Sequence, residues 1–499
     1  MVFRSTRAGL ISAGVVCTAS AVAVGSLLAA RRRRNRKERR VSIQVETDVE
    51  WVRSISSTRW RRMAERLGDP KAVMREALVI VMVGLPARGK SFISNLIVRH
   101  LRMTGVRVKA FNAGQLRRDT GNAGACADFF SATNKDAKAE RERLAMQCVD
   151  DMMDWIYEAP PMKSSVAILD ATNTTVARRA TVVARCNAAA STMAENMGDP
   201  PPLRIIFLES MCDDAKMLEE NYEMKLFNDD YKNNDNPYHA LQDFQRRVRA
   251  YEDQYEPLDM NEFDDAGDLE VQVGSLRIIN GGRSIMSHCI GDSLVAMELV
   301  KLLHSVHLEK RRIILVPEEQ ITAETLAALI HKVEIDDGRY VDLLISANKR
   351  LVLLAEKVAQ LWAETEQAAT PTPFSRRHTR KGDEPERAVL TLRDLAPRSK
   401  ESSVGSGLNN MDSKKATMAA ESFEALAMRL NNTVLLIERM PRSVMVVCGS
   451  EVRRLLLAYF KGVPEDTNPA DIVLPEKPVV ELWRDHKGFA VHECDLPGV

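Results

Sequence analysis

Short apolar runs alternate with longer amphipathic stretches along much of the chain from residue 77 onwards. The run 77–83 (ALVIVMV) is continuous and ends at Gly84, as expected for a strand buried on both faces of a parallel sheet. Similar runs lie at 106–112, 166–170 and 203–209, with helix-like stretches between them. This alternation predicts a doubly wound, mostly parallel α/β domain over residues 77–265.

The pattern changes after about residue 265. Residues 269–279 are typical of paired strands, 285–307 of an amphipathic helix and 312–316 of another strand. The segment 366–416 is rich in Pro, Ser, Thr, Arg and Lys and has few large apolar residues, so we predict a disordered stretch or a long surface insertion. Order is expected again near 422, with a helix to 439, a strand at 443–447 and a helix from 452. A second, discontinuous α/β domain is therefore expected over 266–499.

The first 76 residues have a different character. Residues 8–30 carry no charge and are mostly small or apolar, and the basic run 31–40 follows directly. Such a stretch is long enough to cross a hydrocarbon core of about 30 Å, and the positive-inside rule then puts the C-terminal part in the cytosol. A cleaved organellar import sequence or a secretory signal are the alternatives. We predict a membrane anchor over residues 9–30, within the segment 1–40, and a linker with a lead-in helix over 41–76.

Charge and cysteine content narrow the classes of function. The 70 Lys and Arg residues balance 69 Asp and Glu residues, for a net charge of +1, which argues against a nucleic-acid-binding body. The eight cysteines are scattered singly, without a metal-ligand spacing, and are expected to be reduced thiols on the cytosolic side.

A phosphate-binding loop follows the first predicted strand. The residues GLPARGKS (84–91) fit the pattern GxxxxGK[ST] between a buried strand and a predicted helix (92–103), which is the context that this motif requires. Its backbone N–H groups can surround phosphates, Lys90 can reach the β- and γ-phosphates, and the Ser91 hydroxyl can bind Mg²⁺. The predicted ATP-binding residues here are Gly84, Leu85, Pro86, Ala87, Arg88, Gly89, Lys90, Ser91 and Phe92.

Asp170 closes the apolar run 166–169, so it is expected at the carboxyl end of a central strand, where ligands of open α/β sheets bind. A carboxylate there can organise Mg²⁺ or accept a proton from an attacking hydroxyl; the alternative is an N-cap for the helix that follows. Arginines lie near other predicted strand ends or on nearby helices, and guanidinium groups suit a phosphorylated acceptor. Arg117, Arg178 and Arg247 are such candidates, although an arginine is more often a solvated surface charge.

Five blocks together resemble the kinase half of the bifunctional 6-phosphofructo-2-kinase/fructose-2,6-bisphosphatase family. They are VMVGLPARGKSFIS (81–94), FNAGQLRRD (111–119), LDATNTTVARR (169–179), FLESMCDD (207–214) and AYEDQYEPLD (250–259). The resemblance implies transfer of phosphate from ATP to the 2-hydroxyl of fructose 6-phosphate, with Mg²⁺. It also implies catalytic roles for Lys90, Asp170, Cys212 and Lys225, ATP binding by Asn221, and fructose 6-phosphate binding by Arg117, Arg141, Thr172, Arg178, Arg247 and Tyr251.

The second half resembles the phosphoglycerate-mutase-like bisphosphatase domain of that family more faintly, at 279–307 and 444–462. That reaction needs a histidine nucleophile and a second histidine beside it. After the strand 312–315 the chain instead has Val316, Pro317, Glu318 and Glu319, and Gly449 follows Cys448. A carboxylate cannot replace imidazole here and would repel a phosphate. We therefore predict a degenerate domain without bisphosphatase activity, in which His288, His304 and His307 are ordinary helix residues.

Two other functions stay open at this stage. One is a membrane-tethered protein that binds ATP or a sugar phosphate without turnover, and the other is a P-loop kinase with a different acceptor, such as a nucleotide. A homodimer is possible, and no nucleic-acid partner is expected.

Overall fold

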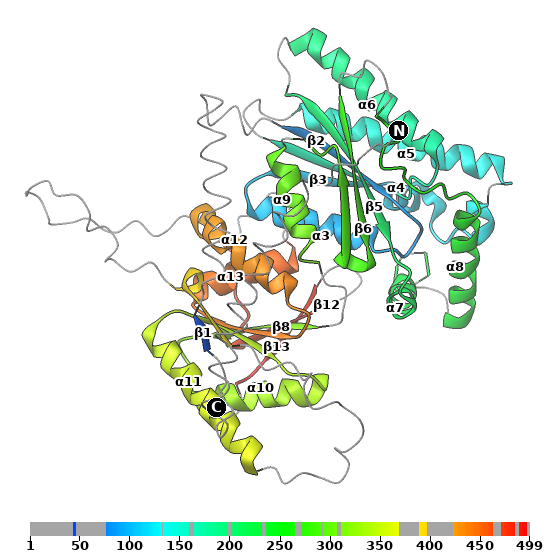
Figure 1. The fold of residues 1–499 in the computed structure, drawn as a ribbon. Helices are drawn as coiled ribbons and strands as arrows, with labels where there is room; N and C mark the ends of the chain where they lie inside the picture. Colours follow the sequence, from blue (N-terminus) through cyan, green and yellow to red (C-terminus); the bar gives the residue numbers. More distant parts are fainter. Residues whose placement is uncertain are drawn as a thin grey trace, which may run out of the picture.

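In the computed structural model, the chain folds into two β-sheets, each covered by helices on both faces (Figure 1). It describes residues 43–45, 76–131, 133–158, 164–197, 201–228, 230–231, 236–264, 271–291, 293–306, 311–368, 389–396, 423–462, 471–484 and 489–496. The predicted α/β class is confirmed, and the sheets of both halves are mostly parallel.

The first sheet has the strand order β3-β4-β2-β5-β6-β7. Its first five strands in that order are parallel, and only β7 is antiparallel. Every residue of β2 is buried, because the strand lies between β4 and β5 with helices on both faces. The strands are β2 (Ala77–Val83), β3 (Arg107–Asn112), β4 (Ser165–Asp170), β5 (Leu203–Met211), β6 (Gln272–Ile279) and β7 (Ser284–His288).

Two apolar cores enclose this sheet. One joins the sheet to α5 (Lys135–Tyr157) and α6 (Val176–Met197), and the other joins its opposite face to α3 (Lys90–Met103) and α9 (Leu294–Leu303). A smaller cluster packs α8 (Pro237–Glu252) and α7 (Ala215–Lys225) beside the carboxyl ends of the strands. The remaining short helices of this half are α4 (Ala113–Arg117), η2 (Arg118–Asn122), η3 (Ala127–Phe130) and η4 (Asn280–Gly282).

The second sheet has the order β1-β10-β9-β11-β8-β12-β13 and is parallel from β1 to β8. One face is covered by α10 (Ala323–Asp337) and α11 (Lys349–Ala368), the other by α12 (Phe423–Arg439) and α13 (Ser450–Lys461) (Figure 1). The remaining elements are β1 (Ile43–Val45), β8 (Arg312–Pro317), β9 (Asp342–Ser346), β10 (Val389–Leu392), η6 (Arg393–Leu395), β11 (Val444–Cys448), β12 (Val479–Arg484) and β13 (Phe489–Cys494).

Several elements differ from the sequence-based expectations. The expected boundary at 265/266 falls inside the first sheet, since β6 pairs with β5 and α9 packs on the same core. Residues 284–288 form a strand where a helix was expected, so His288 lies on β7. The segment 366–416 contains β10, and the segment 41–76 contributes β1, which pairs with it. The sequence-based expectations rested on the pattern of polar and apolar residues within each segment. These strands form instead because they pair with residues far away in the chain.

The helix that follows the phosphate loop also contacts the second half of the chain. Arg99 on α3 donates to Glu438 on α12 at 2.5 Å, and both side chains are buried. The Arg99 guanidinium lies 5.2 Å from the ring centre of Tyr459 on α13, and Tyr459 donates to Glu438 at 3.1 Å. In Figure 1, α12 and α13 accordingly lie between the two sheets, next to α3. A buried ion pair therefore connects the two halves.

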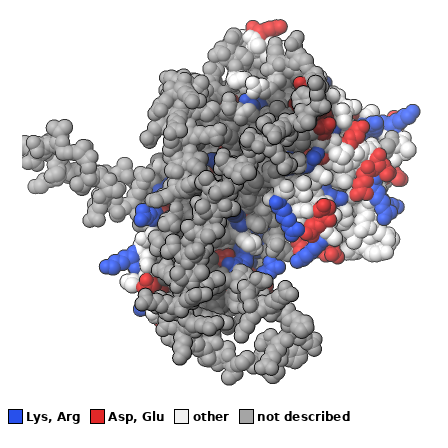
Figure 2. Space-filling model, viewed as in Figure 1, with Lys and Arg blue, Asp and Glu red and all other residues white. Residues whose placement is uncertain are grey.

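The surface carries both signs of charge. On the part of one face that the structure describes, acidic and basic side chains are interspersed (Figure 2). Among the described residues, no helix is both long and apolar enough for a membrane span. The anchor expected at 9–30 lies outside the described residues.

Candidate active site

The turn between β2 and α3 contains backbone conformations with positive φ that its glycines readily adopt. Gly84 has φ +133°, and a Cβ placed there would lie 2.6 Å from the carbonyl oxygen of Ser210 on β5. Gly89 has φ +85°, and Ala87, which is not a glycine, also has a positive φ of 58°. Ser210 fixes the turn a second time, because its hydroxyl donates to the carbonyl of Arg88 at 2.5 Å. The chain therefore wraps tightly at the start of α3, as phosphate binding requires.

Lys90 is buried at the first position of α3. Its Nζ donates to the carbonyl oxygen of Leu85 at 2.6 Å, across the turn. Burial lowers the pKa of Lys90 from 10.5 to about 7, Asp170 opposes this shift, and the nearby cations of Lys225, Arg88 and Arg247 add to it. An anion bound in the turn would favour the charged ammonium. The charges of Asp170 and Arg247 thus both lie close enough to Lys90 to change its pKa.

Asp170 is the last residue of β4 and is buried. The parallel register places Asn112 of β3 opposite Asp170, and the Asn112 amide donates to Asp170 Oδ2 at 2.5 Å. Next along the chain, the Thr172 carbonyl accepts from the Gly84 N–H at 2.9 Å. A carboxylate, together with the hydroxyl of Ser91, offers the oxygen ligands that Mg²⁺ prefers. These two residues therefore fit the cation expected here.

Three of the predicted arginines surround the ring of Phe130. The guanidinium carbons of Arg247, Arg117 and Arg141 lie 3.7, 5.4 and 5.8 Å from its centre. Arg141 also lies 5.9 Å from the ring centre of Tyr251. Phe130 lies on η3, Arg117 ends α4, and Arg247 lies on α8. Residues more than 100 positions apart in the sequence therefore form one cationic cluster.

A carboxylate that the sequence analysis did not single out lies in this cluster. Asp230 accepts from Arg117 at 2.6 and 2.8 Å and from Arg247 at 3.1 Å, and its side chain is only 1% exposed. Burial would raise the pKa of Asp230, but the hydrogen bond from Arg117 and the charges of Arg247 and Arg118 hold it below its usual value. No motif marked Asp230, since an aspartate in a polar loop is ordinarily a surface residue.

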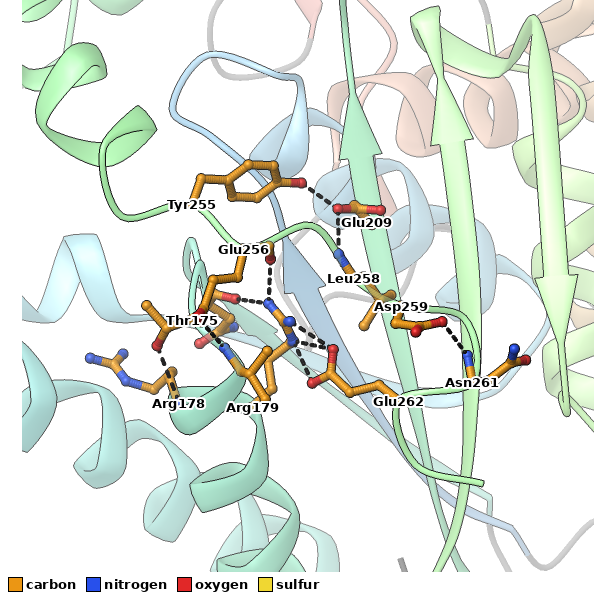
Figure 3. A network of polar contacts seen from close by, with 12 residues as sticks. Thr175, Arg178, Arg179, Glu209, Tyr255, Glu256, Leu258, Asp259, Asn261 and Glu262 are labelled. Carbon is orange, nitrogen blue, oxygen red and sulfur yellow. Dashed lines mark hydrogen bonds and ion pairs between the residues drawn. The ribbon is translucent and has the colours of Figure 1, made fainter. Parts of the chain in front are cut away.

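The two arginines at the start of α6 have different surroundings (Figure 3). Arg178 donates to Glu142 at 2.7 Å and lies near enough to Arg141 to lower the pKa of that guanidinium, after the larger effect of burial. Arg179 is fully buried, pairs with Glu262 at 2.6 Å and donates to the carbonyl of Glu256 at 3.0 Å. Arg178 is therefore bound to Glu142 near Arg141 of the cationic cluster, whereas Arg179 holds the segment that follows α8.

That segment is fastened to the sheet by a second buried carboxylate. Glu209 on β5 accepts from the Tyr255 hydroxyl, from the Leu258 N–H at 2.9 Å and from Arg277 on β6 at 2.5 Å. Figure 3 shows Tyr255 and Leu258 converging on Glu209, and Arg179 between Glu256 and Glu262. The sequence contained Glu209 and Tyr255 inside the quoted blocks, but nothing in their spacing indicated that they pair.

Three further predicted residues lie on α7 or just after β5. Asn221 is buried and its amide donates to the carbonyl of Ala87 at 3.1 Å, which joins α7 to the phosphate loop. Lys225 is half-buried at the end of α7; burial lowers its pKa, while Asp170 opposes the shift. Cys212 follows β5, and its Sγ lies 3.9 Å from the carbonyl of Asp214. Burial raises the pKa of the Cys212 thiol.

The corresponding edge of the second sheet carries carboxylates. Glu318 follows β8, its N–H donates to the carbonyl of Cys448 at 3.2 Å, and its Oε1 would lie 3.3 Å from a Cβ at Gly449. Burial and the neighbouring Glu319 raise the pKa of Glu318. Arg350 donates to the backbone carbonyls of Glu318 at 3.0 Å and Glu319 at 3.4 Å. The carboxyl end of β8 therefore carries two acid side chains, and one of them, Glu318, lies against Gly449 at the end of β11.

Known proteins resemble either the first half of this chain or most of its length. The model of the family described as 6-phosphofructo-2-kinase matches residues 70–300. A 6-phosphofructo-2-kinase/fructose-2,6-bisphosphatase of Caenorhabditis elegans is 32% identical over 81% of this chain and 86% of the relative. A probable 6-phosphofructo-2-kinase of Schizosaccharomyces pombe is 36% identical over 46% of this chain and 31% of the relative. A solved phosphoglycerate mutase of Plasmodium falciparum, 12% identical, covers 37% of this chain and 90% of that structure with a TM-score of 0.22, too low to support an argument.

Proposed function

The chain belongs to the 6-phosphofructo-2-kinase/fructose-2,6-bisphosphatase family, and on that premise we propose that it transfers the γ-phosphoryl group of ATP to the 2-hydroxyl of fructose 6-phosphate. One observation supports this most directly. Arg247 lies close enough to Lys90 to affect its pKa and shares Asp230 with Arg117. A turn suited to a triphosphate thus adjoins a cationic cluster suited to a second phosphate.

Each residue then has a physical task. The backbone N–H groups of the turn and the Lys90 ammonium bind the β- and γ-phosphates, while Asn221 holds the turn through Ala87. Arg117, Arg141, Arg178 and Arg247 grip the 6-phosphate and so orient the 2-hydroxyl towards the γ-phosphorus, which is most of what in-line transfer requires.

Asp170 is the group that receives the proton of the 2-hydroxyl. The Asn112 amide donates to one of its oxygens, which fixes the orientation of the carboxylate. Mg²⁺, held by Ser91 and Asp170, would neutralise charge on the phosphate oxygens. Because Lys225 lies near enough to Asp170 for the two charges to interact, its ammonium can stabilise the negative charge that develops during transfer.

The test is phosphoryl transfer by the purified full chain from ATP to a panel of sugar phosphates and nucleotides. We expect a product phosphorylated at carbon 2 of fructose 6-phosphate, identified by ³¹P NMR. Lys90→Met and Asp170→Asn should each reduce kcat by about 10² or more, while Lys301→Met, an exposed lysine of α9, should have no effect.

A different phosphorylated acceptor would overturn the assignment of substrate. ATP binding without sugar-dependent release of ADP would instead favour the non-catalytic binding protein.

We also propose that the second half lacks bisphosphatase activity. Glu318 and Gly449 occupy the two strand ends where that reaction would need histidines, and Glu318 and Glu319 would repel a phosphate. Incubation of the full chain with fructose 2,6-bisphosphate and no nucleotide should release no inorganic phosphate. Measurable release that Glu318→Gln abolishes would contradict the proposal.

Membrane attachment through residues 9–30, with the catalytic part in the cytosol, is a further proposal that is supported by the apolar run and the basic run after it. Carbonate extraction of membranes and protease protection would test it. Self-association remains a prediction that analytical ultracentrifugation can measure.

A further inference from the structure

Three side chains with different metal-binding atoms meet at the outer edge of the first sheet. His288 Nε2 lies 2.9 and 3.1 Å from the two carboxylate oxygens of Asp264, and Cys289 Sγ lies 3.1 Å from the same Nε2. The three ligand atoms all lie within 4.8 Å of one another. None of these residues belongs to the phosphate-binding region described above.

The position of Cys289 is unusual for a residue that follows a strand. Adjacent residues of a strand point to opposite faces, so Cys289 would ordinarily point away from His288. Instead Cys289 has φ +50°, a left-handed conformation that costs about 1 kcal/mol or more in a non-glycine residue. With this backbone the thiol lies on the same side as the imidazole.

The neighbouring strand leaves room for this conformation. Gly274 on β6 lies against Cys289, and a Cβ there would lie 2.6 Å from the Cys289 carbonyl oxygen. His288 itself is held in register opposite Ser275. The left-handed backbone of Cys289, just after β7, and the glycine on β6 that leaves room for it therefore produce this arrangement together.

Asp264 is brought to the sheet edge by its own neighbours in the chain. Phe263 stacks on Phe207 with ring centres 4.7 Å apart, and Glu262 pairs with the fully buried Arg179. The residues before Asp264 are thus fixed to the core, which presents the carboxylate to His288.

We propose that Asp264, His288 and Cys289 form a binding site for Zn²⁺ or a similar divalent transition metal. A thiolate, an imidazole and a carboxylate are the ligands that zinc uses, whereas Mg²⁺ and Ca²⁺ avoid sulfur. In a tetrahedral zinc site, nitrogen and oxygen ligands lie about 3.4 Å apart, and sulfur and nitrogen about 3.6 Å apart. Separations of 2.9–3.1 Å need to widen by only a few tenths of an ångström, and the fourth position would hold water.

Such a metal would fasten the segment after α8 to β7. That segment carries Tyr255 and Leu258, which bind Glu209, and it follows the helix that bears Arg247 and Tyr251. The site is therefore structural, and it would restrain the connection between the cationic cluster and the edge of the sheet.

The experiment titrates the metal-free full chain with Co²⁺ and then with Zn²⁺. We expect one equivalent of Co²⁺ to produce a thiolate-to-cobalt charge-transfer band that Zn²⁺ abolishes, and Zn²⁺ to raise the unfolding midpoint. His288→Asn and Cys289→Ser should each weaken zinc affinity by about 100-fold or more, since loss of a ligand costs at least as much as loss of its supporting contacts.

The matched controls are His239→Asn and Cys126→Ser, which change exposed residues outside the cluster. Controls that bind like the unmodified chain support the site. The proposal is overturned if no charge-transfer band appears, or if zinc affinity is the same in all four variants. Because the ligands are on the surface, circular dichroism is expected to show folded variants, and a metal-dependent midpoint in His288→Asn would count against the site.

Discussion

Among single residues, Lys90 is a buried side chain that can carry a positive charge, and burying that charge costs stability. Its pKa is lowered to about 7 because burial disfavours the ammonium. The unfolded chain binds the proton up to about pH 10.5, so between pH 7 and 10.5 the unfolded state carries more protons and stability rises with pH. Below pH 7 both states are protonated and the full cost is present.

Replacing Lys90 by Met should therefore stabilise the ligand-free chain while it abolishes phosphoryl transfer. The gain should be largest at pH 6–7, a few kcal/mol given 1.36 kcal/mol per pKa unit, and should shrink as the pH approaches 10. Thermal unfolding at several pH values without nucleotide measures it. A gain that does not depend on pH would show that side-chain packing, not charge, is responsible.

Asp230 makes the opposite contribution, because its carboxylate neutralises two buried or partly buried guanidinium groups. Asp230→Asn should destabilise the chain by about 3 kcal/mol, as expected when one partner of a buried pair is removed. Fructose 6-phosphate should then raise the unfolding midpoint of the variant more than that of the unmodified chain, since its phosphate supplies the missing charge.

The control is Asp119→Asn, which changes an exposed aspartate of the neighbouring helix. Equal ligand-induced shifts in Asp230→Asn and the unmodified chain would refute a shared anion site.

At the scale of elements, the connection from β2 to α3 depends on one close approach between strands. Gly84→Ala adds both a backbone strain at φ +133° and a clash with the Ser210 carbonyl. Gly105→Ala adds strain alone, because Gly105 has φ +81° and no atom within 4 Å of the new Cβ. We expect about 1 kcal/mol of destabilisation at Gly105 and clearly more at Gly84, with loss of ATP binding only there. Denaturant unfolding and nucleotide titration measure both, and similar losses at the two sites would contradict the role of Ser210.

These elements also show how far the sequence alone leads. The run 77–83, the glycine pattern after it and Asp170 at a strand end were predicted correctly as structure, because each is a local signal. Asp230, Phe130 and Asn112 were not singled out, since their importance comes from residues that only the folded sheet brings together. β7 was mistaken for the start of a helix because a short, partly exposed edge strand has little apolar periodicity.

In the whole molecule, the ion pair between Arg99 and Glu438 links the phosphate-loop helix to the second half. Glu438→Gln should destabilise the chain by about 3–5 kcal/mol, because it leaves Arg99 and Arg311 buried without a countercharge. Arg185→Met, which removes an exposed pair with Asp150, should cost less than about 1 kcal/mol.

Urea unfolding compares the two variants, and ATP titration shows whether the loop helix is affected. If Glu438→Gln lowers the free energy of unfolding no more than Arg185→Met does, this ion pair does not hold the two halves together.

The paired glutamates at the end of β8 have a consequence for metabolism if the chain is the proposed kinase. With Glu318 and Glu319 where a phosphate-accepting histidine would be needed, the polypeptide would be unable to hydrolyse the product that it makes. The concentration of its product would then depend on the abundance of a separate hydrolase, and a cell could adjust the two opposing rates by controlling two proteins independently.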